Sequence, residues 1–323
     1  MKSSVILAAL GVLLSTQAAA NEYSPLLKTH KYAEVERAAN AKLAQDPANA
    51  EALVAKSEAV MNGGAARIEE AVKLGEQCVA AHPQVSDCHL ALGNALGSKA
   101  MSAGIMSAMG YAGTIRDELK KAVELDQHNM DARFALQTYY MHAPAIVGGG
   151  NGKARALAEQ TASINADAAK VMAARLDAAE DKLAKAEAAV LSMATSSNDA
   201  VADAQRDLLV NLGNKYMSDK RYADSERVYR EAQKRFPDSE AAVYSLARAM
   251  QEQGKHREAI AGMEQATAMN PRASAHYRIG QSLQALGEKA KALGAYEKAL
   301  SFKTGLPSKM KADAEAQMKV LGK

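Results

Sequence analysis

A pattern of bulky and small residues recurs three times in the last third of the chain, at intervals of 34 and then 33 residues. Each copy holds two stretches with the apolar spacing of a helix, and a proline follows the second stretch. A unit of this length can bury its apolar faces only against its neighbours, so we expect the copies to stack. The recurring positions are Leu209, Leu212, Gly213, Tyr216, Ser225, Tyr229 and Pro237, then Val243, Leu246, Ala247, Met250, Ala259, Met263 and Pro271, then His276, Ile279, Gly280, Leu283, Ala292, Tyr296 and a displaced Pro307.

This pattern resembles the tetratricopeptide repeat, a helix–turn–helix unit with a bulky-x2-Leu-Gly-x2-Tyr first helix and an Ala-x3-aromatic second helix. The resemblance is specific over residues 201–306 and extends, with weaker matches, over most of residues 23–306. No segment shows the sustained alternation of a strand. The resemblance implies an all-α fold, an α-solenoid of about sixteen helices with a concave binding surface.

The regularity of the repeats divides the chain into segments. Residues 21–200 carry divergent repeats, interrupted by a Met-rich helical insertion at 98–116 and a glycine-rich loop at 143–152. Residues 201–306 carry three well-formed repeats. Residues 307–323 form a last amphipathic helix, which we expect to cap the stack.

The first twenty residues have the pattern of a cleavable signal peptide. Lys2 precedes the apolar stretch Val5–Leu14, and Ala18-Ala19-Ala20 supplies an A-x-A cleavage site. Because about ten apolar residues are too few to cross a bilayer, we expect cleavage after Ala20 and no transmembrane segment in the mature chain. For a bacterial chain, this predicts a periplasmic location.

The two cysteines, Cys78 and Cys88, fall on neighbouring helices with Pro83 in the turn between them. Such a turn brings the two positions near one another, and an exported protein favours a disulfide. Two buried free thiols are the alternative. A metal site with His89 is not expected, because no Cys-x2-Cys pair or second nearby histidine completes the ligand set.

The Met-rich insertion contains sixteen consecutive uncharged residues, 100–115. We expect an overlong helical hairpin that either packs on itself or presents an adaptable apolar surface to a partner or to a second copy. The candidate contact residues are Met101, Ile105, Met106 and Met109.

The glycine-rich loop ends in Gly-Gly-Gly-Asn-Gly-Lys, which is similar to a phosphate-binding loop. Val147 stands where that motif needs its first glycine, Ala154 stands where it needs Ser or Thr, and no strand precedes it. A sharp turn into the next helix is therefore the simpler interpretation, with anion binding at that helix N-terminus as the alternative.

In tetratricopeptide repeats the first helix of each unit lines the concave face, so the resemblance places a set of polar and aromatic residues there. Tyrosine and arginine are residue types that anchor interfaces. Val210 stands where a carboxylate-clamping repeat needs a lysine, so a dedicated clamp is not expected. The predicted partner-binding residues are Asn214, Met217, Tyr244, Arg248, Gln251, Tyr277, Arg278 and Gln281.

The charge of the chain is unevenly distributed. Residues 21–200 hold 18 basic and 22 acidic residues, whereas residues 201–323 hold 21 and 15. No basic cluster is interleaved with aromatics, so nucleic acid is not an expected partner. No catalytic motif, cofactor motif or metal-ligand spacing appears either.

These features together predict an exported scaffold, not an enzyme, that needs no cofactor or metal. We expect it to bind a protein or peptide partner in envelope assembly, secretion or polysaccharide export. The alternative is a structural module that forms homo-oligomers through the Met-rich hairpin.

Overall fold

The computed structural model describes residues 22–102, 104–302 and 305–322, so the predicted signal peptide lies outside the described residues. The described residues form seventeen α-helices and no strand, which confirms the all-α prediction. The helices are α1 (Ser24–Lys28), α2 (Tyr32–Gln45), α3 (Ala50–Asn62), α4 (Ile68–Ala81), α5 (Ser86–Ser102), α6 (Ile105–Leu125), α7 (Met130–His142), α8 (Asn151–Thr161), α9 (Ala166–Ala179), α10 (Leu183–Leu191), α11 (Asp199–Ser218), α12 (Tyr222–Arg235), α13 (Glu240–Glu252), α14 (His256–Met269), α15 (Ala273–Ala285), α16 (Lys289–Leu300) and α17 (Ser308–Leu321).

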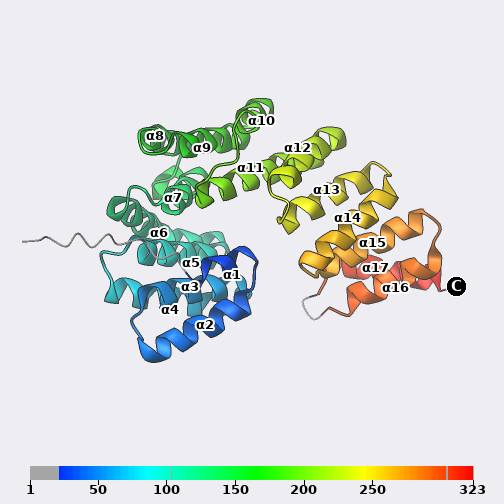
Figure 1. Ribbon diagram of the computed structural model, residues 1–323, viewed down its shortest axis with the longest axis horizontal. Coiled ribbons are helices and arrows are strands. Elements are labelled where there is room, and N and C mark those ends of the chain that lie inside the picture. Colours follow the sequence, from blue (N-terminus) through cyan, green and yellow to red (C-terminus); the bar gives the residue numbers. More distant parts are fainter. Residues whose placement is uncertain (1–21, 103, 303–304, 323) are drawn as a thin grey trace, which may run out of the picture. The chain divides into compact units, whose positions relative to one another are not determined.

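The chain divides into two compact units, Met1–Ala135 and Leu136–Lys323, and the division falls inside α7. The change in repeat regularity at residue 200 lies within the second unit, where α11 begins. Within each unit, helices that follow one another in the chain pack together in pairs (Figure 1). Each unit is therefore a stack of helix pairs, as the repeat pattern predicts.

In the first unit, α3 packs on α4, α4 on α5 and α5 on α6. Small residues permit the closest of these approaches. A Cβ added at Gly75 of α4 would lie 2.8 Å from the Cα of Leu92 in α5, so only glycine allows this helix contact. The helices α5 and α6 are longer than their neighbours, at 17 and 21 residues, and the Met-rich segment spans the turn between them.

In the second unit, three regular pairs follow one another: α11 with α12, α13 with α14, and α15 with α16. The first helices also contact one another in series, α11 with α13, α13 with α15, and α15 with α17. We call the surface built by α11, α13, α15 and α17 the first-helix face. Helix α17 continues this series at its C-terminal end, as a capping helix does.

The turns between the paired helices repeat at the same interval as the sequence. Lys220, Gly254 and Gly287 all have positive φ, at 58°, 76° and 78°. In the first of these turns the next amide reaches back to close the helix, with Arg221 N donating to Tyr216 O at 2.8 Å, and the other two turns repeat this bond. These residues therefore form left-handed C-terminal caps, and Lys220 fills a position that favours glycine.

The glycine-rich loop is held by bonds within its own unit. Tyr139 Oη donates to the Val147 carbonyl at 2.6 Å, and Lys153 Nζ donates to the Gly148 carbonyl at 2.9 Å. A Cβ at Gly149 would lie 1.8 Å from the Ala143 carbonyl oxygen, so the turn requires glycine there. These contacts favour the interpretation of the loop as a sharp turn into α8.

Candidate functional site

The structure places all eight predicted partner-binding residues on α11, α13 and α15, three of the four helices of the first-helix face. Their accessibility differs. The side chains of Tyr244, Gln251 and Tyr277 are buried, at 6 to 9% exposure, and contact other repeats of the same chain. The partly exposed members of the set are Asn214, Met217, Arg248, Arg278 and Gln281.

Gln251 and Arg278 join α13 to α15 through a reciprocal set of hydrogen bonds. Gln251 Nε2 donates to the Arg278 carbonyl and to Ser282 Oγ, each at 2.8 Å. Arg278 Nη1 donates to Gln251 Oε1 at 2.8 Å, and it lies 3.5 Å from Glu252 Oε1. This arrangement fixes the Arg278 guanidinium beside the first-helix face and leaves Gln251 without free donors.

Tyr277 and Gln281 are tied to α17. Tyr277 Oη donates to Asp313 Oδ2 at 2.6 Å and accepts a bond from Gln281 Nε2 at 2.8 Å. Burial raises the pKa of Tyr277 to about 12, and the Asp313 carboxylate adds to this shift. The phenol therefore stays protonated at neutral pH and serves as a donor between two helices.

Arg248 is the contrasting residue of the set. It makes no hydrogen bond or ion pair with any described residue, and its Nε, like that of Arg278, is buried without a partner. Burial raises the pKa of the Tyr229 hydroxyl, and the positive charge of Arg248 nearby opposes that shift. That hydroxyl donates to Asn214 Oδ1 at 2.8 Å. A guanidinium without a carboxylate partner, beside an amide, is suited to receive an anionic or carbonyl group from outside.

Tyr244 is supported by a charged pair that was not singled out in the sequence. The Arg272 guanidinium lies over the Tyr244 ring, 4.8 Å from its centroid, and it also forms an ion pair with Glu240. Burial raises the pKa of Glu240 and Arg272 opposes that effect. Glu240 and Arg272 are 32 residues apart, which is close to one repeat length. This spacing is the sequence feature that could have indicated a contact between them.

The Met-rich hairpin exposes part of its apolar surface. Met101 at the end of α5 is 90% exposed, and Met109 in α6 is 45% exposed. Ile105 and Met106 belong to the first turn of α6, but their side chains lie outside the described residues. Whether these residues contact a partner or a second copy stays a prediction.

Cys78 and Cys88 form a disulfide in the structure, with their Cα atoms 5.2 Å apart. Both are fully buried, and the bond joins the end of α4 to the start of α5. Next to Cys88 in α5, His89 Nδ1 lies 2.6 Å from Glu118 Oε2 and His89 Nε2 lies 3.1 Å from the Pro83 carbonyl. The histidine is thus used within the fold of the first unit.

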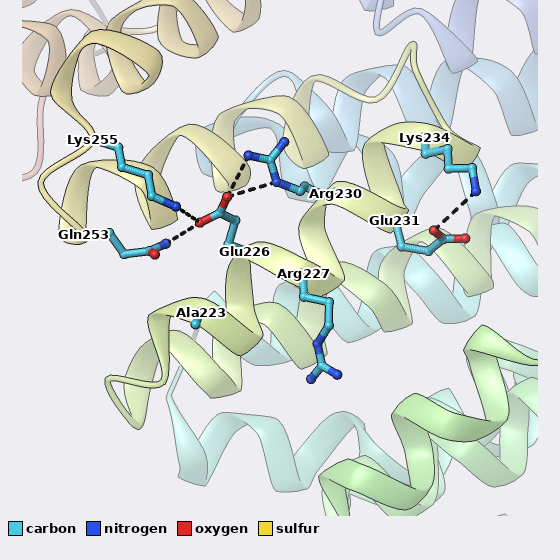
Figure 2. Close-up of a pocket in the computed structure, with 8 residues that line it drawn as sticks. All are labelled: Ala223, Glu226, Arg227, Arg230, Glu231, Lys234, Gln253 and Lys255. Carbon is cyan, nitrogen blue, oxygen red and sulfur yellow. Dashed lines mark hydrogen bonds and ion pairs between the residues drawn. The ribbon is translucent and has the colours of Figure 1, made fainter.

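A pocket of about 430 Å³ lies on α12 and the turn between α13 and α14, away from the predicted residues (Figure 2). At one side Glu226, which is buried, accepts bonds from Arg230, Lys255 and Gln253 at 2.7 to 2.9 Å. Burial alone would raise the pKa of Glu226, but these bonds outweigh it and lower the pKa to about 2. The residues lining the pocket are Ala223, Glu226, Arg227, Arg230, Glu231, Lys234, Gln253 and Lys255.

Over the described ranges, no group of three or more His, Cys, Asp and Glu side chains is arranged to hold a metal ion. Within the same ranges, no helix combines the length and the apolar character needed to cross a bilayer.

Two family models match the second unit, and both describe the tetratricopeptide repeat. One covers residues 216–286 and the other residues 273–304. Residues 216–304 therefore carry tetratricopeptide repeats. Neither matching model describes an enzyme. No curated protein matches the chain.

The chain is also similar to several solved structures. Yeast Tom70 aligns with a TM-score of 0.60 at 11% identity, over 91% of this chain and 59% of that chain. The tetratricopeptide domain of Sgt2 from Aspergillus fumigatus aligns at 26% identity over 41% of this chain and 83% of that one, with a TM-score of 0.35. YrrB, described as a tetratricopeptide protein with an unusual peptide-binding site, aligns at 15% identity over 76% and 99% of the two chains, with a TM-score of 0.36. The match to Tom70 shows the shared tetratricopeptide-type fold.

Proposed function

We propose that the chain is a scaffold that binds a protein or peptide partner on the first-helix face of its tetratricopeptide repeats. The observation that carries this proposal is Arg248, a partly exposed arginine with no partner among the described residues. A guanidinium loses hydrogen bonds to water when a partner covers it, so a ligand must supply an acceptor. A peptide carbonyl or carboxylate meets this requirement.

Two other partly exposed residues of the first-helix face support the same chemistry. Asn214 on α11 accepts a bond from Tyr229, and Gln281 on α15 donates one to Tyr277. The amide nitrogen of Asn214 and the amide oxygen of Gln281 are the groups that a peptide backbone would pair with. Met217 adds a partly exposed apolar side chain near Tyr229. Tyr244, Gln251 and Tyr277 act as supports, because their polar and aromatic groups already contact other repeats.

We further propose that this scaffold is exported to the periplasm and serves envelope assembly, secretion or polysaccharide export. The signal-peptide pattern of residues 1–20 supports export. Cell fractionation tests it directly, since retention of the full-length chain in the cytoplasm would contradict export.

Site-specific photocrosslinking in cells tests the binding surface. A photoreactive residue at Met217 or Gln281 should give protein adducts, and Arg248→Ala should reduce their yield about tenfold because a buried anchor is lost. The matched control places the same photoreactive residue at Arg257, an exposed position on α14. Adducts at Met217 and Gln281 that are indifferent to Arg248→Ala, while those at residue 257 are equally abundant, would reject this surface.

The exposed methionines favour a second candidate function, self-association through the Met-rich hairpin. Met101 and Met109 offer flexible apolar contacts that a second copy can cover. Analytical ultracentrifugation at micromolar concentration distinguishes the two functions. A monomer excludes self-association, and an oligomer that persists in Met109→Glu excludes the hairpin as its interface.

A further inference from the structure

The pocket on α12 presents positive charge on the opposite member of the helix pair from the first-helix face. Four of its eight lining residues are basic and two are acidic. Both acidic residues are already bonded. Glu226 is saturated by Arg230, Lys255 and Gln253, and Glu231 accepts a bond from Arg235 Nε at 2.6 Å. Because both carboxylates are already paired with cations, they repel an incoming anion only weakly.

The basic side chains remain accessible. Lys234 is 79% exposed, and its ion pair with Glu231 is long, with Nζ 3.9 Å from Oε2. Arg227 and Arg230 are more than half exposed, although Arg227 also contacts Glu187 and Asp224. Figure 2 shows Lys234 at one end of the pocket and Lys255 at the other. Lys234 and Lys255 thus present positive charge at the two ends of the site.

The spacing of these cations selects the size of the ligand. Arg227, Arg230 and Lys234 stand at intervals of three and four residues, so they share one face of α12. At 1.5 Å per residue, the first and last are about 10 Å apart along the helix axis. A single small anion cannot contact both ends. An extended peptide places alternate side chains on one side about 7 Å apart, which is close to the separation of about 6 Å between Arg230 and Lys234 along the helix axis.

We propose that this pocket docks an acidic peptide segment of a partner protein, with carboxylates at alternate positions meeting Arg230 and Lys234. Lys255 closes the other side of the pocket, and the Glu226 cluster holds Arg230 and Lys255 in place. This interaction lies beyond the proposed partner binding at Arg248, since it uses α12 and the α13–α14 turn. Recognition of acidic segments by clustered basic side chains is an established mode of peptide binding.

Fluorescence anisotropy with a labelled decapeptide of alternating Glu and Ser tests the proposal. Saturable binding is expected at about 50 mM NaCl, and it should weaken as salt is raised because exposed charges are screened. Lys234→Glu should weaken binding about fivefold or more, since it replaces an attraction by a repulsion. The matched control is Lys170→Glu, because Lys170 is 64% exposed and pairs with a carboxylate three residues earlier at 3.7 Å, as Lys234 does.

Each other outcome overturns the proposal. Absence of saturable binding up to millimolar peptide, or equal weakening by the two lysine variants, would leave only a general attraction between charges. Loss of binding in Arg248→Ala would move the peptide to the first-helix face. Competition by inorganic phosphate at the same concentration as the peptide would make this a small-anion site. Circular dichroism of Lys234→Glu confirms that the exposed substitution leaves the fold intact.

Discussion

Gly213 offers the sharpest test of how the helix pairs pack. It lies in α11, and a Cβ added there would be 2.3 Å from Cε1 of Tyr229 and 2.6 Å from Cζ. Carbon atoms in good contact lie about 3.5 to 4 Å apart, so the ring or the helix must move by more than 1 Å. Tyr229 has little freedom to move, because it is fully buried and its hydroxyl is bonded to Asn214.

The expected cost of Gly213→Ala follows from three contributions. Overpacking a buried site costs about 1 to 3 kcal/mol, and a displaced ring loses a hydrogen bond worth about 1 kcal/mol. Alanine regains about 1 kcal/mol through its higher helix propensity. We therefore expect the free energy of unfolding to fall by about 2 kcal/mol. Gly294 is the matched control, because it lies inside α16 with no atom within 4 Å of an added Cβ.

Urea denaturation followed by circular dichroism at 222 nm measures both variants. Gly294→Ala should raise the free energy of unfolding by about 0.5 to 1 kcal/mol, so the two substitutions have opposite signs. Combining Gly213→Ala with Tyr229→Leu should recover part of the loss, since the smaller side chain removes the clash. The packing argument fails if Gly213→Ala is neutral or stabilising, or if its cost is the same in the Tyr229→Leu background.

Three further variants test the charged cluster, the disulfide and the turns. The pKa of Glu226 is lowered to about 2, so its contribution to stability is fully present above the unfolded pKa near 4.5 and is lost as the pH falls toward 2. Glu226→Gln should therefore reduce the loss of stability in acid by about 1 to 2 kcal/mol, after a discount for solvent screening. Urea titrations at graded pH measure this difference. Cys78→Ser with Cys88→Ser should cost about 2.5 to 3 kcal/mol, because the bond closes a short loop of separation 10, and a reductant should lower the stability of the wild type alone. Lys220→Gly should gain about 0.5 to 1 kcal/mol by thermal denaturation, since Lys220 has a φ of 58°.

The helices were predictable because each repeat encodes its helix pair in a short, local sequence pattern. Each pair buries its apolar stripe against adjacent pairs, so helical spacing alone locates α11 to α16. The Ala-rich stretch that forms α9 and α10 also keeps helical spacing, through Leu176 and Leu183. The left-handed turn at Lys220 was not predicted, because lysine carries no turn signal of the kind that Gly254 carries.

The site was predictable only to the level of the helix. Membership of a first helix placed Tyr277 and Gln251 on the correct element, but their burial depends on side chains one repeat away. Asp313 lies 36 residues after Tyr277, and Arg278 lies 27 residues after Gln251. Likewise, Glu226 meets Lys255 only through the register of two adjacent pairs. The sequence of one repeat does not indicate which side chains of the next repeat it will contact.

The partners of the first-helix face also decide where along it a ligand can bind. Between α15 and α17, Asp313 already accepts the Tyr277 hydroxyl. Between α13 and α15, Gln251 uses its amide on Arg278 and Ser282, and Arg278 is partly neutralised by Glu252. Between α11 and α13, Arg248 has no such partner among the described residues. Because an uncompensated cation attracts an acceptor more strongly than one already paired, we propose that the α11–α13 stretch supplies the anchoring contact for the peptide partner.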